Sequence, residues 1–192
     1  MEFTIKTATP EKFRAGILVA GAFADGALPA PTAVLDKAAD GRIAALIKRG
    51  DLDEKAGSTL LLHELPGAAA ERVLLVSLGK AEDFGDKAYR DALGAAAKAL
   101  SASAAKDAGV LLADTDMSAR TLDWRLQQAA RILADGAYRF DAPKSGKDAK
   151  KERGAKKVTL LIAGKVSAAL ETAVRRGQAI AEGMALAKDL GN

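Results

Sequence analysis

The stretch STLLLHELPGAAAERVLLVSLG, residues 58–79, decides how the sheet of this protein is built. It contains two apolar runs, STLLLHEL and ERVLLVSLG, joined by the five residues PGAAA. A connection this short cannot carry a crossover helix, so we expect the two runs to form antiparallel neighbouring strands. The hairpin therefore makes the sheet a mixed one.

Other strand-like and helix-like segments alternate on both sides of this hairpin. Strands are expected within residues 2–7, 16–23, 108–115 and 157–164, where apolar residues alternate with polar ones or form short continuous runs. Helical spacing marks residues 28–52, 80–104, 118–140 and the segment from Ser167 to the end. This order predicts an α/β protein, a three-layer α/β/α domain with a mixed, mostly parallel sheet.

The expected boundaries of two helical segments can be stated in detail. In residues 28–52, Thr32 or Asp40 is a candidate N-cap, Gly41 divides the segment into two helices, and Gly50 ends the second. The closing helix begins at the N-cap Ser167. Its apolar residues form one stripe that is expected to pack onto the sheet, namely Leu170, Val174, Ile180, Met184 and Ala187.

Composition excludes several classes of protein. The 192 residues are 49% hydrophobic and 28% charged, as in an ordinary globular protein, and they include no cysteine, which excludes disulfides and thiolate chemistry within them. The sequence has no signal-like start and no run of about 18 apolar residues. We therefore expect a cytoplasmic protein that does not enter a membrane.

The excess of positive charge is local. Residues 144–157, KSGKDAKKERGAKK, hold seven basic and two acidic side chains, whereas the rest of the chain is about neutral. This segment is either a solvated connector or a contact for the phosphates of DNA. The candidate nucleic-acid contacts are Lys144, Lys147, Lys150, Lys151, Arg153, Lys156 and Lys157.

Isolated polar residues give only weak indications of a site. His63, the single histidine, has no partner with the spacing of a metal site or catalytic triad, and the turn at Gly79 matches no dinucleotide or Walker pattern. Asp114 and Asp116 follow a strand and could hold a cation, but capping of the next helix by Asp116 or Ser118 is the commoner use.

Three segments together resemble the N-terminal part of the cytosol (leucyl) aminopeptidase family. RVLLVSLGKAEDF (residues 72–84) is similar to a strand and turn of that family, with Ser77 where glycine is usual, and YRFDAPKS (138–145) is similar to its lysine-rich connector. GMALAKDLGN (183–192) resembles the start of a family motif through Gly183, Ala187, Lys188, Asp189, Leu190 and Asn192.

The resemblance implies a macro-domain-like N-terminal domain over residues 1–165. A connecting helix over 166–192 would lead to a C-terminal catalytic domain absent from this chain. The parent would be a homo-hexameric exopeptidase that uses two divalent ions, manganese or zinc, to release N-terminal amino acids, leucine preferred, from peptides. No catalytic, metal-binding or cofactor-binding residue of the family has a counterpart here, so this chain alone should be inactive.

Two alternatives remain beside this interpretation. One is a DNA-binding or regulatory module that acts through residues 144–157. The other is a macro-type domain that binds a nucleotide such as ADP-ribose at the ends of its strands.

Overall fold

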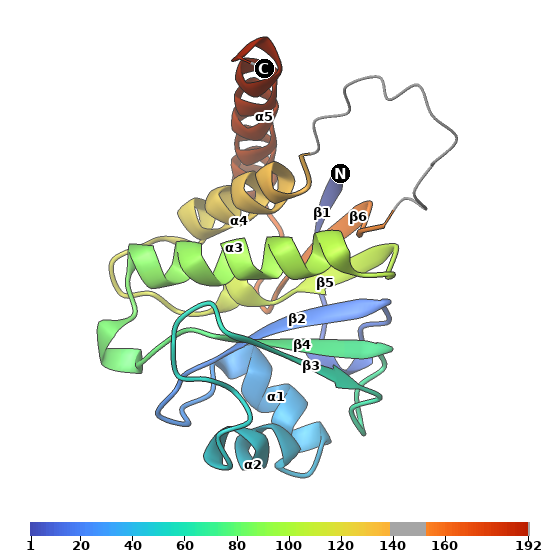
Figure 1. The fold of residues 1–192 in the computed structure, drawn as a ribbon, viewed down its shortest axis with the longest axis vertical. Helices are drawn as coiled ribbons and strands as arrows, with labels where there is room; N and C mark the ends of the chain where they lie inside the picture. Colours follow the sequence, from blue (N-terminus) through green and yellow to red (C-terminus); the bar gives the residue numbers. More distant parts are fainter. Residues whose placement is uncertain (139–152, 192) are drawn as a thin grey trace.

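The computed structural model describes residues 1–138 and 153–191 (Figure 1). Within them the chain forms one six-stranded sheet in the order β1-β6-β5-β2-β4-β3. The strands are β1 (Glu2–Thr7), β2 (Ile17–Ala22), β3 (Thr59–His63), β4 (Arg72–Ser77), β5 (Asp107–Val110) and β6 (Lys157–Ile162).

The sheet is mixed and mostly parallel, as predicted. The β3–β4 pair is antiparallel, with Leu61 opposite Leu74, and every other neighbouring pair in this sheet is parallel. The short connection between β3 and β4 therefore makes the hairpin expected from residues 58–79. β1 forms one edge of the sheet and β3 the other.

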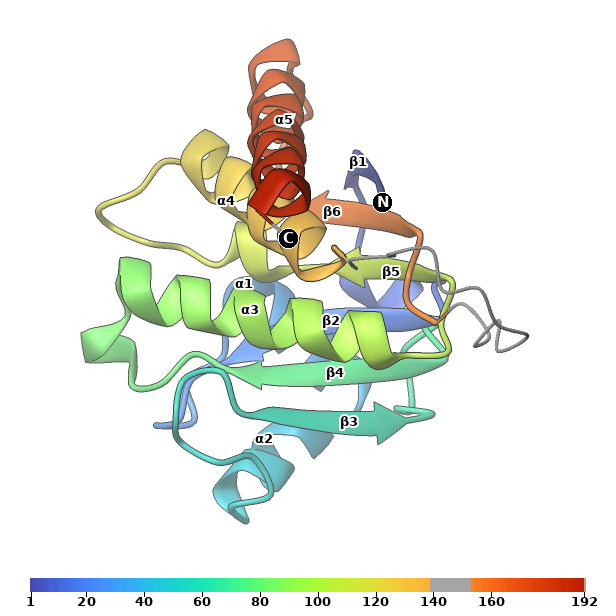
Figure 2. The same ribbon diagram turned by 45° about the horizontal axis from the view of Figure 1, so that its top comes forward.

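Helices cover both faces of the sheet (Figures 1 and 2). Helices α1 (Ala30–Ala38) and α2 (Arg42–Lys48) lie on one face, and α3 (Asp86–Ala102) and α4 (Leu122–Gly136) lie on the other. Helix α5 (Ala168–Gly191) packs on α4, and single 3-10 turns occur at Pro10–Lys12, Ala81–Asp83 and Leu112–Asp114, denoted η1, η2 and η3. None of the helices in this described part of the chain is both long and apolar enough to cross a membrane.

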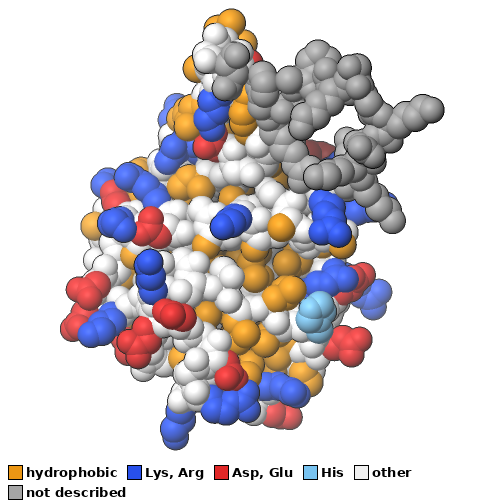
Figure 3. Space-filling view, viewed as in Figure 1, with side chains coloured by type: hydrophobic (Ala, Val, Ile, Leu, Met, Phe, Trp, Pro, Cys, Tyr) orange, Lys and Arg blue, Asp and Glu red, His pale blue; other side chains and the backbone are white. Residues whose placement is uncertain are grey.

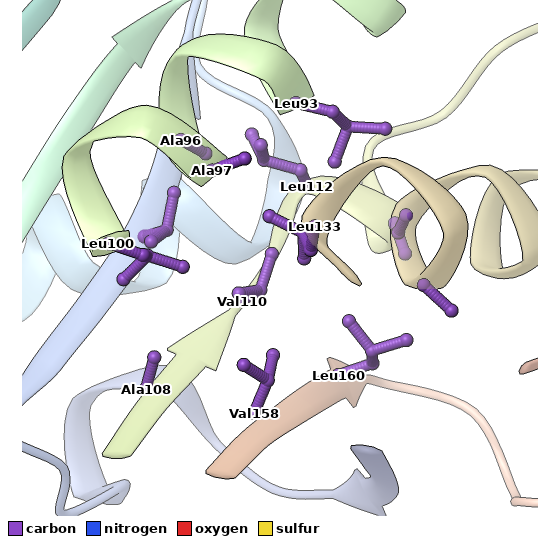
Figure 4. Close-up of a cluster of buried hydrophobic side chains, with 14 of the residues drawn as sticks. Leu93, Ala96, Ala97, Leu100, Ala108, Val110, Leu112, Leu133, Val158 and Leu160 are labelled. Carbon is purple, nitrogen blue, oxygen red and sulfur yellow. The ribbon is translucent and has the colours of Figure 1, made fainter. Parts of the chain in front are cut away.

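The central strand β2 contributes to both hydrophobic cores. Ile17 and Val19 belong to the core beneath α3 and α4, whereas Leu18 and Ala20 belong to the core beneath α1 and α2. This division follows from the alternation of side chains along a strand. The first core is made of small and branched side chains, among them Leu93 and Ala97 of α3, Val110 of β5 and Leu160 of β6 (Figure 4).

The segment of residues 28–52 divides at Gly41, as predicted, but both proposed N-caps are wrong. The N-cap positions of α1 and α2 are Pro29 and Gly41, and neither makes a side-chain capping hydrogen bond. Thr32 lies inside the first turn of α1, where its hydroxyl donates to the carbonyl of Gly21 at 2.7 Å. Gly41 has φ +76°, a left-handed conformation that glycine adopts without strain, and this conformation separates the two helices.

Helix α5 begins where expected but does not pack as expected. The N–H of Glu171 donates to the carbonyl of Ser167, and the first helical residue is Ala168. Its buried residues are Ala173, Val174, Gly177 and Ala181, whereas Ile180 is 41% exposed. The predicted stripe is therefore wrong beyond Val174, because α5 crosses α4 and then projects away from the sheet (Figure 1).

Candidate functional site

A ligand site is expected at the edge of the sheet at which the parallel strands end. β2 ends at Ala22, β4 at Ser77, β5 at Val110 and β6 at Ile162, and the segments after them meet at this edge. Ligands of open α/β sheets bind outside the carboxyl ends of the strands. The polar groups that follow each strand are therefore the candidates for a ligand site.

A carboxylate of the protein itself, that of Asp25, is already bound at the turn that contains Gly79. The N–H of Gly79 lies 3.3 Å from the Oγ of Ser77, and the N–H of Ala81 donates to the carboxylate of Asp25 at 3.3 Å. The other oxygen of Asp25 accepts from the N–H of Ala27 at 3.1 Å. A phosphate at this turn would compete with the Asp25 carboxylate for the same donors and would be repelled by its charge.

Asp114 and Asp116 do not form a joint cation site. The carboxylate of Asp114 accepts from the N–H of Ala163 at 3.0 Å, which ties η3 to the end of β6, and burial raises the pKa of Asp114. The side chain of Asp116 is 99% exposed and lies 3.6 Å from Nη1 of Arg125. In the described ranges, no group of three or more His, Cys, Asp or Glu side chains could hold a metal ion.

The expected capping role of Asp116 or Ser118 is also wrong. Helix α4 begins at Leu122, and its N-cap position is Thr121, so both residues lie outside the helix. Strand β5 ends four residues before Asp114, and η3 uses Asp114 as its last residue. The chain therefore needs a further loop before it can enter α4.

A cluster of aromatic and arginine side chains lies beside this loop. Trp124 is the centre of the cluster, with the guanidinium of Arg120 4.7 Å and that of Arg90 5.9 Å from its ring. Three ring-to-ring contacts, at 5.2–6.3 Å between centroids, form a chain of aromatic side chains. They join Trp124 to Tyr89, Tyr89 to Phe84, and Phe84 to Phe23. No local sequence pattern indicates this cluster, because its members come from separate segments.

Charged side chains fix the cluster in place. Arg120 makes two hydrogen bonds to the carboxylate of Asp86, at 2.8 and 2.6 Å, and Arg90 lies 3.6 Å from the same carboxylate. The hydrogen bond from Arg120 lowers the pKa of Asp86. The loop before α4 is thereby attached to the start of α3.

Arg125, a buried side chain, also links the loop before α4 to α3. It is 8% exposed, its Nη1 donates to the carbonyl of Thr115, and its own carbonyl accepts from the hydroxyl of Tyr89 at 2.9 Å. Burial raises the pKa of Tyr89 far above its ordinary range. A buried arginine with these partners stabilises the junction of η3, α3 and α4.

The remaining sequence candidates lie away from the strand ends. His63 is exposed and pairs in register with Arg72 at the start of β4, which is the opposite edge of the sheet. Lys157 begins β6 at that same edge, and the N–H of Lys156 donates to the carbonyl of Lys106 at 2.8 Å.

Four of the seven candidate nucleic-acid contacts, Lys144, Lys147, Lys150 and Lys151, lie outside the described residues. On the face shown in Figure 3, basic and acidic side chains are interspersed over the α/β body. The described surface on that face therefore has no single basic patch.

An open pocket of about 430 Å³ lies between the segment before β3 and the first turns of α3. Its charged lining residues are Lys55, Arg90 and Asp91, and Asp91 is paired with Lys87 at 2.6 Å. The pocket is a shallow surface feature with one carboxylate and two cations, and nothing in the sequence marked it.

Comparison of the sequence with known proteins identifies a family and relatives within it. The N-terminal domain of the cytosol aminopeptidase family matches residues 19–147. The probable cytosol aminopeptidase of Azoarcus sp. strain BH72 is 69% identical over 193 residues, and the match covers 100% of this chain and 39% of the relative. The chain thus spans about two fifths of the length of that relative.

Solved structures share the fold. A mutant of tomato leucine aminopeptidase superposes with a TM-score of 0.77 at 22% identity, over 99% of this chain and 38% of that one. The bottromycin maturation enzyme BotP in complex with Mn gives 0.64 at 24% identity, over 93% of this chain and 32% of that one. The macro domain of ganglioside induced differentiation associated protein 2 gives 0.65 at 8% identity, over 93% and 85%. The predicted macro-domain-like, three-layer architecture is confirmed.

Proposed function

Because this chain belongs to the cytosol aminopeptidase family, as the N-terminal domain of that family, we propose that it is the non-catalytic part of a metal-dependent exopeptidase. The observation that carries the proposal is the extent of the match, which takes in this whole chain but only 39% of the Azoarcus relative. The catalytic residues are assigned to the remaining length of such a protein.

The polar groups at the strand ends support this assignment. The carboxylates of Asp25 and Asp114 accept hydrogen bonds from backbone N–H groups of their own domain. The guanidinium of Arg120 is bound to the carboxylate of Asp86. Side chains engaged in this way position loops. The described residues also do not fit a metal centre, so the two divalent ions expected for the parent, manganese or zinc, are assigned to its C-terminal domain.

The proposal extends to the division of the chain and to its partners. We assign residues 1–165 to the domain and 166–192 to the connecting helix, and the end of β6 at Ile162 and the start of α5 at Ala168 support this assignment. The partners are the C-terminal catalytic domain of the same polypeptide and further copies in a cytoplasmic homo-hexamer. The substrates of the whole protein are peptides with a free N-terminus, leucine preferred.

A turnover assay tests the proposal. The 192-residue chain and the full-length protein are each incubated with leucine p-nitroanilide and added Mn²⁺. We expect release of p-nitroaniline by the full-length protein alone. N-acetyl-leucine p-nitroanilide is the matched control, since an exopeptidase of this kind requires the free amine. Turnover by the purified 192-residue chain, or none by the full-length protein, would overturn the proposal.

A second candidate function is DNA binding through residues 144–157, which the local concentration of seven basic side chains favours. Counterion release makes such binding steeply dependent on salt. A variant with alanine at all seven basic positions should lose both the affinity and most of the salt dependence in a fluorescence-anisotropy titration with duplex DNA. Unchanged binding by this variant would refute the idea.

A further inference from the structure

Helix α5 extends away from the sheet (Figures 1 and 2). Along its length it crosses α4 at close range. A Cβ atom added to Gly177 would lie 2.3 Å from the carbonyl oxygen of Gln127 and 2.9 Å from the Cβ of Ala130. The two backbones are therefore in direct contact at this point, and the crossing fixes where α5 leaves the domain.

Four side chains fix the direction of the projecting end. Nζ of Lys188 donates to the carboxylate of Asp135 at 2.5 Å, and the hydroxyl of Tyr138 donates to the carboxylate of Asp189 at 2.5 Å. Nζ of Lys188 also lies 5.1 Å from the centre of the Tyr138 ring. These contacts hold the inner face of α5 to the end of α4, so the outer face has a defined orientation.

The outer face is apolar and exposed. At 3.6 residues per turn, it covers a sector of about 120° and a length of about 16 Å. No charged side chain lies within this sector, and hydrophobic side chains are visible on the projecting end in Figure 3. The outer face consists of Ala179, Ile180, Gly183, Leu186, Ala187 and Leu190.

Exposure of this face increases toward the end of the helix. Ile180 is 41% exposed, Leu186 61% and Leu190 82%. Apolar side chains in a contiguous exposed patch are typical of a surface that another protein part covers. Here the least covered residue is the one nearest to the point from which the longer relatives continue.

We propose that the outer face of α5 is a docking surface for the C-terminal domain of the same polypeptide. This inference rests on the proposed function. The match to the Azoarcus relative leaves about three fifths of that chain beyond the N-terminal domain. A domain joined directly to α5 is held beside the outer face at high effective concentration, so even a modest apolar contact is occupied. The contacts of Tyr138 with Asp189 and of Lys188 with Asp135 orient the outer face before docking.

Cysteine labelling tests the proposal, because the 192 residues contain no cysteine. Leu186→Cys reports on the outer face, and Leu190→Cys is a second reporter on the last turn. Val34→Cys is the matched control, since Val34 is 41% exposed on α1, away from α5. Each variant is made in the 192-residue chain and in the full-length protein, and reaction with a maleimide is followed by mass spectrometry of the labelled peptide.

In the 192-residue chain, we expect all three variants to react at similar rates. In the full-length protein, Leu186→Cys and Leu190→Cys should react at least tenfold more slowly, while Val34→Cys is unchanged. Equal rates in both proteins would overturn the inference. Protection already present in a dimeric 192-residue chain would also overturn it, because the occupant would then be a second copy.

The unsubstituted full-length protein separates this inference from the proposed function. Hydrolysis of leucine p-nitroanilide with unprotected cysteines refutes docking and leaves the proposed function in place. Protected cysteines in a protein that does not hydrolyse the substrate refute the proposed function and support docking.

Discussion

Replacing Gly177 with alanine is expected to destabilise the protein, although alanine is the better helix former. In a helix interior, glycine to alanine stabilises by about 1 kcal/mol, because glycine loses more backbone freedom on folding. At Gly177 the added Cβ would lie 2.3 Å from the carbonyl oxygen of Gln127. A carbon and a carbonyl oxygen rest at about 3.3 Å, so α4 and α5 would have to separate by about 1 Å.

The change in the free energy of unfolding is the balance of the gain in helix propensity and the cost of the steric overlap. Forcing extra volume into a packed contact costs about 1–3 kcal/mol, and the upper end applies here because the opposing atom belongs to a helix backbone and cannot rotate away. Separation of the helices also loosens Val174 and Ala181, which are buried near the crossing. We therefore expect Gly177→Ala to lower the free energy of unfolding by about 2 kcal/mol.

Gly94→Ala is the matched control for this substitution. Gly94 is also inside a helix, α3, but it is exposed and an added Cβ would meet no atom within 4 Å. It should stabilise the protein by about 0.5–1 kcal/mol. Urea unfolding followed by circular dichroism measures both variants. A Gly177→Ala protein as stable as the parent would refute the close crossing of α4 and α5.

Three further outcomes are expected. In a spectrophotometric titration neither tyrosine should ionise near pH 10, because Asp189 raises the pKa of Tyr138 to about 12 and burial raises that of Tyr89 further; Asp189→Asn should return Tyr138 toward 10. Arg120→Gln should raise the pKa of Asp86, measured by carboxyl NMR. Since the folded pKa of Asp86 lies below its unfolded value, this ion pair stabilises above that unfolded value and is lost as pH falls, so acid unfolding should begin at higher pH in the variant. Calorimetry with ADP-ribose should show no heat while Asp25 occupies the Gly79 turn, and a saturable signal would refute that reasoning.

The antiparallel pair within the sheet could be predicted from the sequence because the length of its connection decided it. The five residues between the two apolar runs of residues 58–79 are too few for a crossover, and this alone requires an antiparallel pair. Gly41 likewise separates two helices through its own backbone conformation. Such features depend on neighbours in the chain.

Features that depend on distant segments could not be predicted. Thr32 looked like an N-cap, but a buried carbonyl of β2 lies within reach of its hydroxyl. The apolar residues of α5 looked like one stripe, but α4 covers the face of α5 that contains Gly177 and Ala181, so Ile180, Leu186 and Leu190 are left exposed. The same holds for the candidate site, since Asp86, Arg120 and Trp124 meet only after α3 and α4 have packed.

Equilibrium dialysis against Mn²⁺ tests where the metal centre of the whole protein lies, which we place outside residues 1–192. Both the 192-residue chain and the full-length protein are dialysed, and the bound metal is measured by mass spectrometry. We predict about two ions per full-length chain and none in the 192-residue chain. Stoichiometric Mn²⁺ in the 192-residue chain would show that the metal centre lies within these residues.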